Sequence, residues 1–189
     1  MIEIRKTGRE DFDRVYEIME KSFPDDEYRE YEEQRELFSR PEYSVYVVDG
    51  QTDAESLKAF SAVWEFDDFM YIEHLAVNPD SRNGGVGASV LKALQEMYDK
   101  PICLEVELPE NELARRRIGF YSRNGFNLNH YPYIQPPMSA GKNPVPLLIM
   151  TTGGVLAESE FINMRDILYK NVYKLSLIHI SEPTRPLYI

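Results

Sequence analysis

The chain alternates between two hydrophobic periods, and this alternation predicts its secondary structure. Helical segments place apolar residues three and four positions apart, as Phe12, Val15, Ile18 and Met19 do. Strand segments either alternate apolar and polar residues or form short apolar runs bounded by turn residues. The predicted strands cover residues 2–5, 43–48, 57–66, 69–77, 102–108, 126–131 and 145–151. The predicted helices cover residues 12–22, 25–38, 86–97, 111–123 and 158–173.

The order of these elements predicts one α/β (α+β) domain over residues 1–174. Asp67-Asp68 turns one strand back on the next, so that residues 57–77 form a hairpin. No internal repeat and no long linker divides the chain. We therefore expect a mixed, mostly antiparallel central sheet flanked by helices.

Residues 175–189 form a segment that we set apart from the domain. They read LSLIHISEPTRPLYI, and the helical pattern before them stops abruptly. This stretch resembles the read-through translation of a sequencing adapter, although Leu177, Ile178 and Ile180 would also suit a strand. We predict a non-native tail, expect the natural C-terminus to be missing, and take no functional residue from it.

Composition and charge restrict the classes of partner. The 189 residues carry a formal net charge of −11, which disfavours binding to nucleic-acid phosphates or to an anionic membrane leaflet. A single cysteine, Cys103, excludes an internal disulfide, and the spacing of His74, His130 and His179 offers no zinc site. No segment has the pattern of a signal peptide or a membrane span, so we expect a cytoplasmic protein without metal. The oligomeric state is left open, with a homodimer as one option.

The most informative segment follows the hairpin and reads NPDSRNGGVGAS. Amide groups at a glycine-rich helix N-terminus converge on one point and favour an anion such as a pyrophosphate, and Arg82 adds a positive charge. A P-loop is excluded because Ala88-Ser89 follows Gly87 where Lys-Ser or Lys-Thr is needed. A dinucleotide-binding loop is disfavoured because Val90 occupies the position of its third glycine.

A third class of phosphate loop fits. Residues 82–87, Arg-Asn-Gly-Gly-Val-Gly, match the [Arg/Gln]-x-x-Gly-x-[Gly/Ala] signature of the GNAT family of N-acetyltransferases. The segments EHLAVNPDSR and RRRIGFYSRNGF also resemble parts of that family, in its order and spacing. The chain thus resembles a GNAT protein from residue 2 to about residue 173. This resemblance implies a GNAT-like fold and acetyl-CoA as the acetyl donor.

The resemblance also implies which residues hold acetyl-CoA. The loop and the first helical turn would bind the pyrophosphate, and a backbone N–H at Val77 or an immediate neighbour would stabilise the oxyanion of the thioester. The implied cofactor-binding residues are Leu75, Ala76, Val77, Arg82, Asn83, Gly84, Gly85, Val86, Gly87 and Ala88.

Glu73 is the predicted general base for the acceptor amine. Strand alternation places it on the face of Tyr71, Leu75 and Val77, where apolar neighbours are expected to raise its pKa toward useful base strength. GNAT proteins often carry a Glu at the matching strand position. The alternative bases, on the polar face of a later strand, are Glu105 and Glu107.

Tyr121 is the predicted proton donor for the departing thiolate. It lies in the helix at 111–123, where the family places a Tyr whose hydroxyl faces the coenzyme A sulfur. Its reference pKa is close to that of a thiol, so the transfer is energetically reasonable. Ala114 occupies the place of an Asn that often holds the pantetheine arm, and Asn111 lies further back. Cofactor contacts from this helix therefore stay open.

Other chemistry-bearing residues have two interpretations each. His74 is expected to point to the face opposite Glu73 as a packed residue, and Cys103 to pack in the sheet. The three arginines at 115–117 either reach coenzyme A phosphates or form a solvated helix face. The segment at 130–144 is either an ordinary surface loop or the rim of the acceptor site, which would then include Tyr131, Tyr133 and Gln135.

Together these residues predict an N-acetyltransferase that transfers an acetyl group directly from acetyl-CoA to a primary amine. The amine belongs to a small molecule or a peptide, and the acidic balance favours a cationic one. The alternative is a non-catalytic acyl-CoA-binding sensor on the same fold. Transfer of a longer acyl group depends on the depth of the pocket, which the sequence leaves open.

Overall fold

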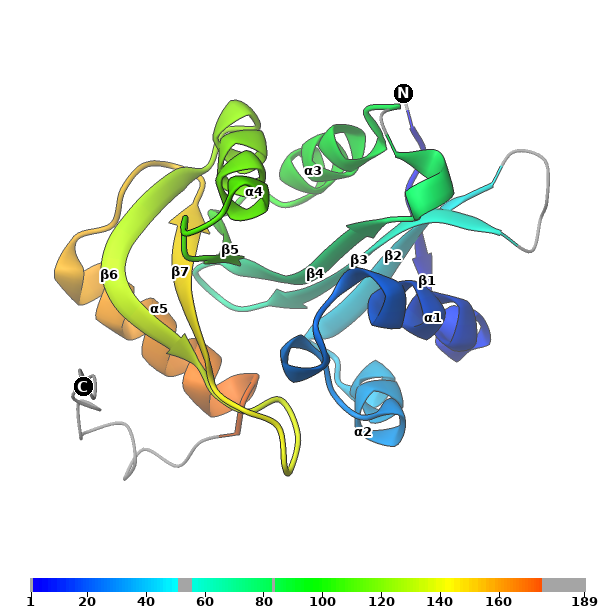
Figure 1. Cartoon of the computed structure of the whole chain (residues 1–189), viewed down its shortest axis with the longest axis horizontal. Helices are drawn as coiled ribbons and strands as arrows, with labels where there is room; N and C mark the ends of the chain where they lie inside the picture. The colour runs from blue at the N-terminus through cyan, green and yellow to red at the C-terminus, as the bar shows by residue number, and fades with distance from the viewer. Residues whose placement is uncertain (1, 51–55, 83, 175–189) are drawn as a thin grey trace.

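The computed structural model describes residues 2–50, 56–82 and 84–174. Its strands are β1 (Arg5–Thr7), β2 (Tyr43–Asp49), β3 (Leu57–Glu65), β4 (Met70–Val77), β5 (Ile102–Glu107), β6 (Asn127–Gln135) and β7 (Val145–Thr151). Its helices are α1 (Phe12–Ser22), α2 (Tyr31–Glu36), α3 (Val86–Met97), α4 (Glu112–Arg123) and α5 (Glu158–Asn171). The predicted fold class, a mixed sheet with flanking helices, is confirmed (Figure 1). The predicted tail at 175–189 lies outside the described residues.

The strands form one sheet in the order β1-β2-β3-β4-β5-β7-β6. Every neighbouring pair is antiparallel except β4 and β5, which are parallel and are joined through α3. The β4–β5 register ends at the pair Ile72 and Leu104, although β4 continues to Val77 and β5 to Glu107. Each strand keeps its pairing with its other neighbour over these last residues. The sheet therefore contains an internal gap between two strands that are each held from outside.

A β-bulge lies in β4 beside this gap. Ala62 pairs with His74 and Val63 pairs with Ile72, so Glu73 is the extra residue of the bulge. A bulge shifts the alternation of side chains by one position. Sequence alternation alone therefore gives the wrong face for the residues that follow it.

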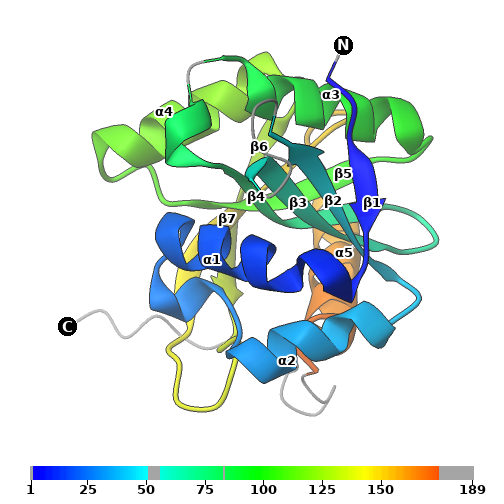
Figure 2. The same ribbon diagram turned by 90° about the vertical axis from the view of Figure 1, so that its right-hand side faces the viewer.

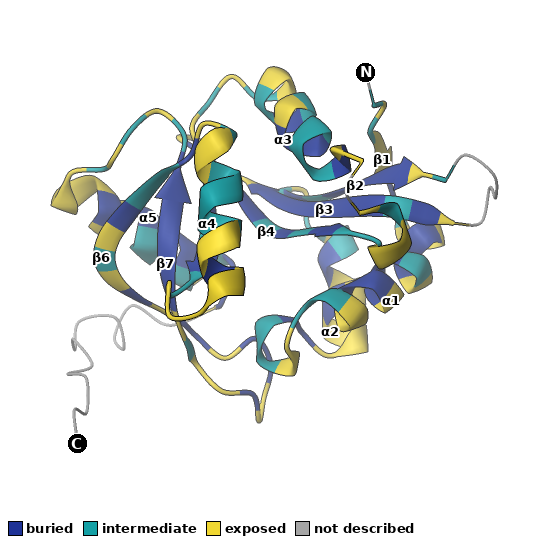
Figure 3. Ribbon diagram, turned by 45° about the horizontal axis from the view of Figure 1, so that its top comes forward, coloured by how far each residue is buried: buried dark blue, intermediate teal, exposed yellow. Residues whose placement is uncertain are grey.

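Two apolar clusters hold helices to the two faces of the sheet. On one face α1, α2 and α5 lie over the first cluster, and on the other α3 and α4 lie over the second (Figures 1 and 2). Phe12 and Leu168 belong to the first cluster, and Val90 and Leu94 to the second. Each such fully buried side chain contributes about 1.5–3 kcal/mol relative to its exposed state. The outer surfaces of α3 and α4 stay exposed, while β3 and β7 are buried (Figure 3).

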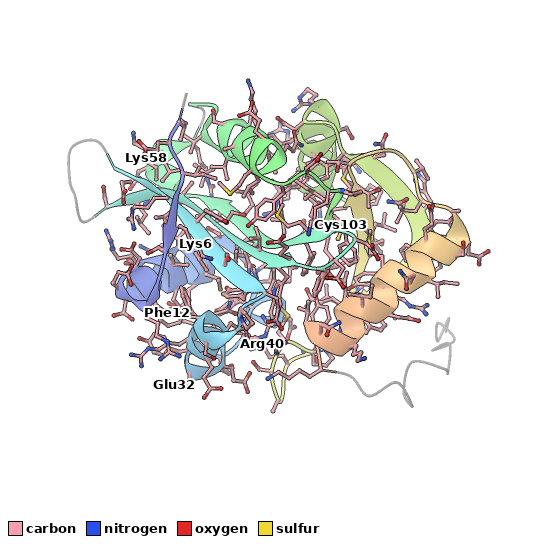
Figure 4. The ribbon with its side chains drawn as sticks, turned by 180° about the vertical axis from the view of Figure 1, so that it is seen from behind. Lys6, Phe12, Glu32, Arg40, Lys58 and Cys103 are labelled. Carbon is pink, nitrogen blue, oxygen red and sulfur yellow. The ribbon has the colours of Figure 1, made fainter. Side chains whose placement is uncertain are left out.

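Cys103 lies in the middle of the sheet, as predicted, and its side chain is fully buried (Figure 4). Burial raises the pKa of its thiol well above the usual value. Burial and a raised pKa both disfavour the thiolate form that acts as a nucleophile.

The predicted helix at 25–38 is wrong in its extent. Asp25–Glu27 forms a single 3₁₀ turn, and Tyr28 is extended with φ −143° and ψ 161°. Helix α2 is only six residues long and is followed by another 3₁₀ turn. The reason is tertiary: the side chains of Tyr28 and Arg29 are buried, and a continuous helix would not deliver both of them to the core.

The strand predicted at 126–131 is also longer than expected. Strand β6 continues to Gln135, with a shift of register against β7 between Asn129 and Tyr133. The first part of the predicted loop at 130–144 is therefore strand. Among the described residues, no helix has the length and apolar character that crossing a membrane requires.

Candidate active site

A cavity of about 470 Å³ occupies the gap between β4 and β5. We call the part of the cavity on the face of α1 the α1 side. It is lined by Ser22, Phe23, Glu27, Gln135 and Leu147. From the opposite face, the α4 side, it is lined by Arg82, Gly87, Leu113, Arg116, Arg117, Phe120 and Tyr121. Between them lie the unpaired ends of the two strands, residues 73–77 and 105–107. Two reactants that enter from opposite faces could therefore meet within the sheet.

Two glycines allow the glycine-rich loop and the start of α3 to lie at the cavity. Gly85, at the N-cap of α3, has φ +71°, a conformation that costs other residues about 1–2 kcal/mol. A Cβ on Gly87 would lie 3.3 Å from Phe120 and 3.5 Å from Val77, so a side chain there would push α3 from the cavity wall. The N–H groups of the first turn of α3 have no partner within the helix and favour an anion.

Arg82 adds a positive charge to this end of the cavity. Its side chain is exposed, and its Nε donates to the backbone oxygen of Val77 at 3.4 Å. Gly84 and Gly85 are exposed, Ala88 is half-buried, and the side chain of Val86 is buried in the second cluster. Val86 can therefore offer a ligand only its backbone. Asn83 lies outside the described residues.

Strand β4 presents peptide groups to the gap. Peptide groups of a strand point alternately to its two neighbours, and residues after Ile72 have no partner in β5. Leu75, Ala76 and Val77 all line the cavity. The peptide N–H groups of these residues that point away from β3 can thus make the contacts that the family resemblance implies, whereas the side chains of Leu75 and Val77 pack against the second cluster.

Tyr121 lines the α4 side of the cavity from a half-buried position. Its ring packs against those of Phe120 and Phe126, with centroid distances of 5.2 and 5.8 Å. Burial raises the pKa of Tyr121 to about 12, and nearby Arg117 acts in the opposite direction. The hydroxyl is therefore protonated at neutral pH and can donate a proton. Asn111 caps α4, since its side chain accepts from the N–H of Ala114 at 2.9 Å.

Glu73 forms a buried ion pair with Arg29. Its Oε1 lies 2.7 Å from Nη1 of Arg29, and the two side chains are 0% and 6% exposed. Arg29 also donates to the backbone oxygen of Val172 at 3.1 Å. The apolar surroundings predicted for Glu73 are therefore wrong. The error arises because the partner comes from the segment that was predicted as a continuous helix.

His74 lies on the same side as Glu73, contrary to the prediction. Because Glu73 is the bulged residue, the two side chains are adjacent, with Nδ1 of His74 3.6 Å from Oε2 of Glu73. The predicted shared face of Tyr71, Leu75 and Val77 is wrong for the same reason: Tyr71 belongs to the first cluster, and the other two pack against the second.

The environment of His74 fixes its tautomer. Its side chain is 1% exposed, and its Nε2 lies 2.9 Å from the backbone oxygen of Glu27. A carbonyl oxygen only accepts, so Nε2 carries a proton and donates. Burial lowers the pKa of His74, which leaves Nδ1 as an unprotonated acceptor. Within the described part of the chain, neither this Nδ1 nor Oε2 of Glu73 has a hydrogen-bond partner.

Glu105 stands at the matching position on the other side of the gap, directly after Leu104. Three tyrosine hydroxyls donate to it: Tyr71 to Oε2 at 2.8 Å, Tyr173 to Oε1 at 2.9 Å, and Tyr133 to Oε1. Burial raises the pKa of Glu105 to about 7, while the three hydrogen bonds act against this rise. Its carboxyl group is therefore balanced between its two protonation states near neutral pH.

Two further carboxylates face the cavity. Burial, and then repulsion from Glu107, raise the pKa of Glu27 to about 7. Glu107 is paired with Arg117 at 3.0 Å. Sequence reasoning missed Glu27, because it predicted a charged helix there, and nothing in the run Asp25-Asp26-Glu27 singles out its last member.

Comparison with known proteins decides the family. The profile of the Acetyltransferase (GNAT) family matches residues 12–126. The chain belongs to this family. A solved Bacteroides thetaiotaomicron protein described as a GNAT-family acetyltransferase is 37% identical, with a TM-score of 0.83; the match covers 93% of this chain and 100% of that one.

Other similarities to this GNAT protein are more limited. YjbC of Bacillus subtilis, named as an acetyltransferase, is 38% identical over 64 residues; the chain spans 33% of that curated relative, and the match covers 33% of the chain. Arabidopsis thaliana NAA60 in complex with acetyl-CoA is 16% identical with a TM-score of 0.62, over 80% of this chain and 97% of that one. At this identity the likeness shows the fold alone.

The GNAT cavity brings most of the sequence-predicted residues together. Those that line it are Glu73, Leu75, Ala76, Val77, Arg82, Gly87 and Tyr121, with Glu105 and Glu107 opposite. The residues that lie beside it, at the start of α3, are Gly84, Gly85, Val86 and Ala88. Of the suggested acceptor rim, Gln135 lines the cavity and Tyr133 reaches Glu105, but Tyr131 instead donates to the backbone oxygen of Leu156.

The three arginines of α4 divide between the two interpretations. Arg116 and Arg117 line the cavity, whereas Arg115 does not and donates to the backbone oxygen of Pro109 at 3.1 Å. The α4 side of the cavity thus carries the guanidinium groups of Arg82, Arg116 and Arg117. The α1 side carries carboxylates. Arg116 and Arg117 are themselves paired with Glu112 and Glu107, at 2.6 and 3.0 Å.

Proposed function

We propose that this GNAT protein transfers an acetyl group from acetyl-CoA to a primary amine by direct transfer in a ternary complex. The observation that carries the proposal is the end of β4–β5 pairing at Ile72 and Leu104, beyond which one cavity reaches both faces of the sheet. A thioester on the α4 side and an amine on the α1 side can meet there without a covalent enzyme intermediate.

Binding of acetyl-CoA would rest on the loop and the first turn of α3. Arg82 and the amides of residues 84–88 would hold the pyrophosphate, and the unpaired backbone at Leu75, Ala76 and Val77 would hold the pantetheine arm. One of these N–H groups would also stabilise the oxyanion that forms at the thioester carbonyl. The Arabidopsis neighbour was solved with acetyl-CoA, which agrees with this cofactor.

The reaction itself needs one proton acceptor and one proton donor. The amine nitrogen bonds to the thioester carbon and loses a proton, the C–S bond breaks, and the departing sulfur takes a proton from Tyr121. We propose Glu105 as the acceptor of the amine proton, because it has no cationic partner in the described structure and its pKa is raised to about 7. Glu73, the acceptor predicted from sequence, would instead position the β4 bulge through Arg29, and separate Gln variants of the two residues decide between them.

The decisive experiment measures coenzyme A thiol release with acetyl-CoA and a library of primary amines. We expect amine-dependent release by the full chain. Binding of acetyl-CoA without transfer to any amine would favour the sensor alternative, and absence of acetyl-CoA binding would contradict both. Mass spectrometry of the product identifies the acetylated nitrogen.

Gly85→Asp tests the cofactor side of the proposal. A carboxylate at the start of α3 would repel the pyrophosphate, so we expect acetyl-CoA affinity to fall by at least about 100-fold in titration calorimetry. The matched control is Gly153→Asp, because Gly153 also has a left-handed φ, +83°, with nothing within 4 Å of its would-be Cβ. Equal affinities for the two variants would disprove the loop assignment.

A further inference from the structure

The α1 side of the cavity holds more negative charge than acetyl transfer to a simple amine requires. Glu107 is balanced by Arg117, and Glu73 by Arg29. Among the ion pairs of the described residues, none contains Glu27 or Glu105. Two carboxylates that line one cavity thus have no ion-pair partner among the described residues.

The reaction compensates only one of these two charges. The attacking amine must be neutral, so its proton passes to Glu105 and that carboxyl group becomes neutral as well. Glu27 takes no part in this exchange. A second group on the acceptor that stays cationic would balance the charge of Glu27 during transfer.

An independent observation at the same cavity indicates a missing hydrogen-bond donor. Nδ1 of His74 and Oε2 of Glu73 are both buried, lie 3.6 Å apart, and have no donor within the described structure. Because Nε2 of His74 already donates to the backbone of Glu27, Nδ1 can only accept. Two adjacent acceptors are stabilised by a group rich in N–H donors, as an ammonium is.

We propose that the acceptor is an aliphatic diamine or polyamine, with one amine acetylated at the β4–β5 gap and a second ammonium group bound by Glu27. The inference rests on the proposed function and specifies its substrate class. The apolar side chains of Phe23 and Leu147, which line the same side, suit the methylene chain between two amines. The net charge of −11 would also attract a dication more strongly than a monocation.

Glu27→Gln is a suitable variant because it removes charge without removing a structural contact. The hydrogen bond from His74 goes to the backbone oxygen of Glu27, which the substitution leaves in place. The groups that influence the ionisation of Glu27 are Glu107, Arg117, Glu105 and Asp26, and all of them are kept. Glu20→Gln is the matched control, because Glu20 is an exposed glutamate of α1 that does not line the cavity.

The experiment compares kcat/KM for putrescine with that for butylamine, which has the same carbon chain and one amine fewer. We expect the wild type to prefer putrescine by roughly tenfold or more, and Glu27→Gln to abolish this preference by lowering kcat/KM for putrescine alone. Glu20→Gln should keep the preference.

Three outcomes would overturn this inference. These are equal kcat/KM for the two amines in the wild type, an unchanged preference in Glu27→Gln, or transfer only to amino sugars or peptides. In each of these cases acetyl transfer still occurs, so the proposed function stands. If no amine releases thiol although acetyl-CoA binds, the proposed function itself has failed.

Discussion

Glu73 and Glu105 occupy matching positions and have very different surroundings. Each is the first residue after the last pair of the β4–β5 ladder, and each lines the same cavity. Glu73 is held by the guanidinium of Arg29, whereas Glu105 is held by the hydroxyls of three tyrosines. A guanidinium brings a positive charge to the carboxylate that it contacts, whereas phenol hydroxyls donate hydrogen bonds without adding a charge. Matching positions on two strands therefore do not give the two carboxylates the same surroundings, and this difference is the reason that we propose Glu105 as the base.

We expect the substitution Glu105→Gln to have the largest effect, which is a loss of turnover. An amide cannot accept the amine proton, so we expect kcat to fall by roughly 10²–10⁴-fold with acetyl-CoA affinity unchanged. Thiol release measures the first quantity and titration calorimetry the second. Glu110→Gln, an exposed glutamate beyond the end of β5, is the control.

One pair of results would instead identify Glu73 as the proton acceptor. If Glu105→Gln keeps wild-type turnover and Glu73→Gln loses it, the proton acceptor is Glu73, as its strand position suggested. Arg29 would then have to release that carboxylate during the reaction.

We expect the second largest effect from Glu73→Gln, which should lower the stability of the protein. Removal of one charge from a buried ion pair leaves the other uncompensated, at a cost of about 3–5 kcal/mol. Since the introduced amide would still accept a hydrogen bond from Arg29, we expect a loss near the lower end of this range, about 3 kcal/mol, in the free energy of unfolding measured with urea. Turnover of the folded protein should fall by less than about tenfold.

Replacing both partners of this pair tests the electrostatic reason. Arg29→Met combined with Glu73→Leu removes both charges and should cost less stability than either single substitution. A double variant that loses as much as the two single variants together would show that Arg29 and Glu73 do not act as a pair.

Much of the fold, and the glycine-rich loop on the α4 side of the cavity, could be predicted from the sequence, because both depend on local patterns. The loop at 82–88 is recognisable from its glycines, and α3 from its apolar face. The α1 side of the cavity could not be predicted, because it depends on contacts between distant segments. The β4 bulge is set by register against β3, and neither strand's own alternation shows it.

The partners of the two carboxylates illustrate the same limit. Arg29 reaches Glu73 only because the chain is extended at Tyr28, where the local pattern favours a helix. Tyr133 and Tyr173 reach Glu105 from β6 and from just beyond α5, far away in sequence. Sequence reasoning could therefore give only a short list of candidate bases. That list included Glu105, but it could not show the three tyrosines that contact this residue.

The smallest expected effect concerns the pH dependence of transfer and isolates the role of the tyrosines. If Glu105 accepts the amine proton as proposed, its deprotonated form is the active one, so kcat/KM should fall as the pH drops below about 7, the value to which burial raises the pKa of Glu105. The hydrogen bond from Tyr133 lowers that pKa, so Tyr133→Phe should raise it and move the acidic limb to higher pH. A hydrogen bond with a net value of about 0.5–1.5 kcal/mol corresponds to a shift of the pKa by roughly half a unit to one unit.

Tyr131→Phe, two residues earlier on β6, is the control. It removes a hydroxyl that donates to the backbone oxygen of Leu156 and should leave the pH profile unchanged. A shift to lower pH in Tyr133→Phe, or equal shifts in both variants, would show that Glu105 is not the group whose ionisation controls the reaction.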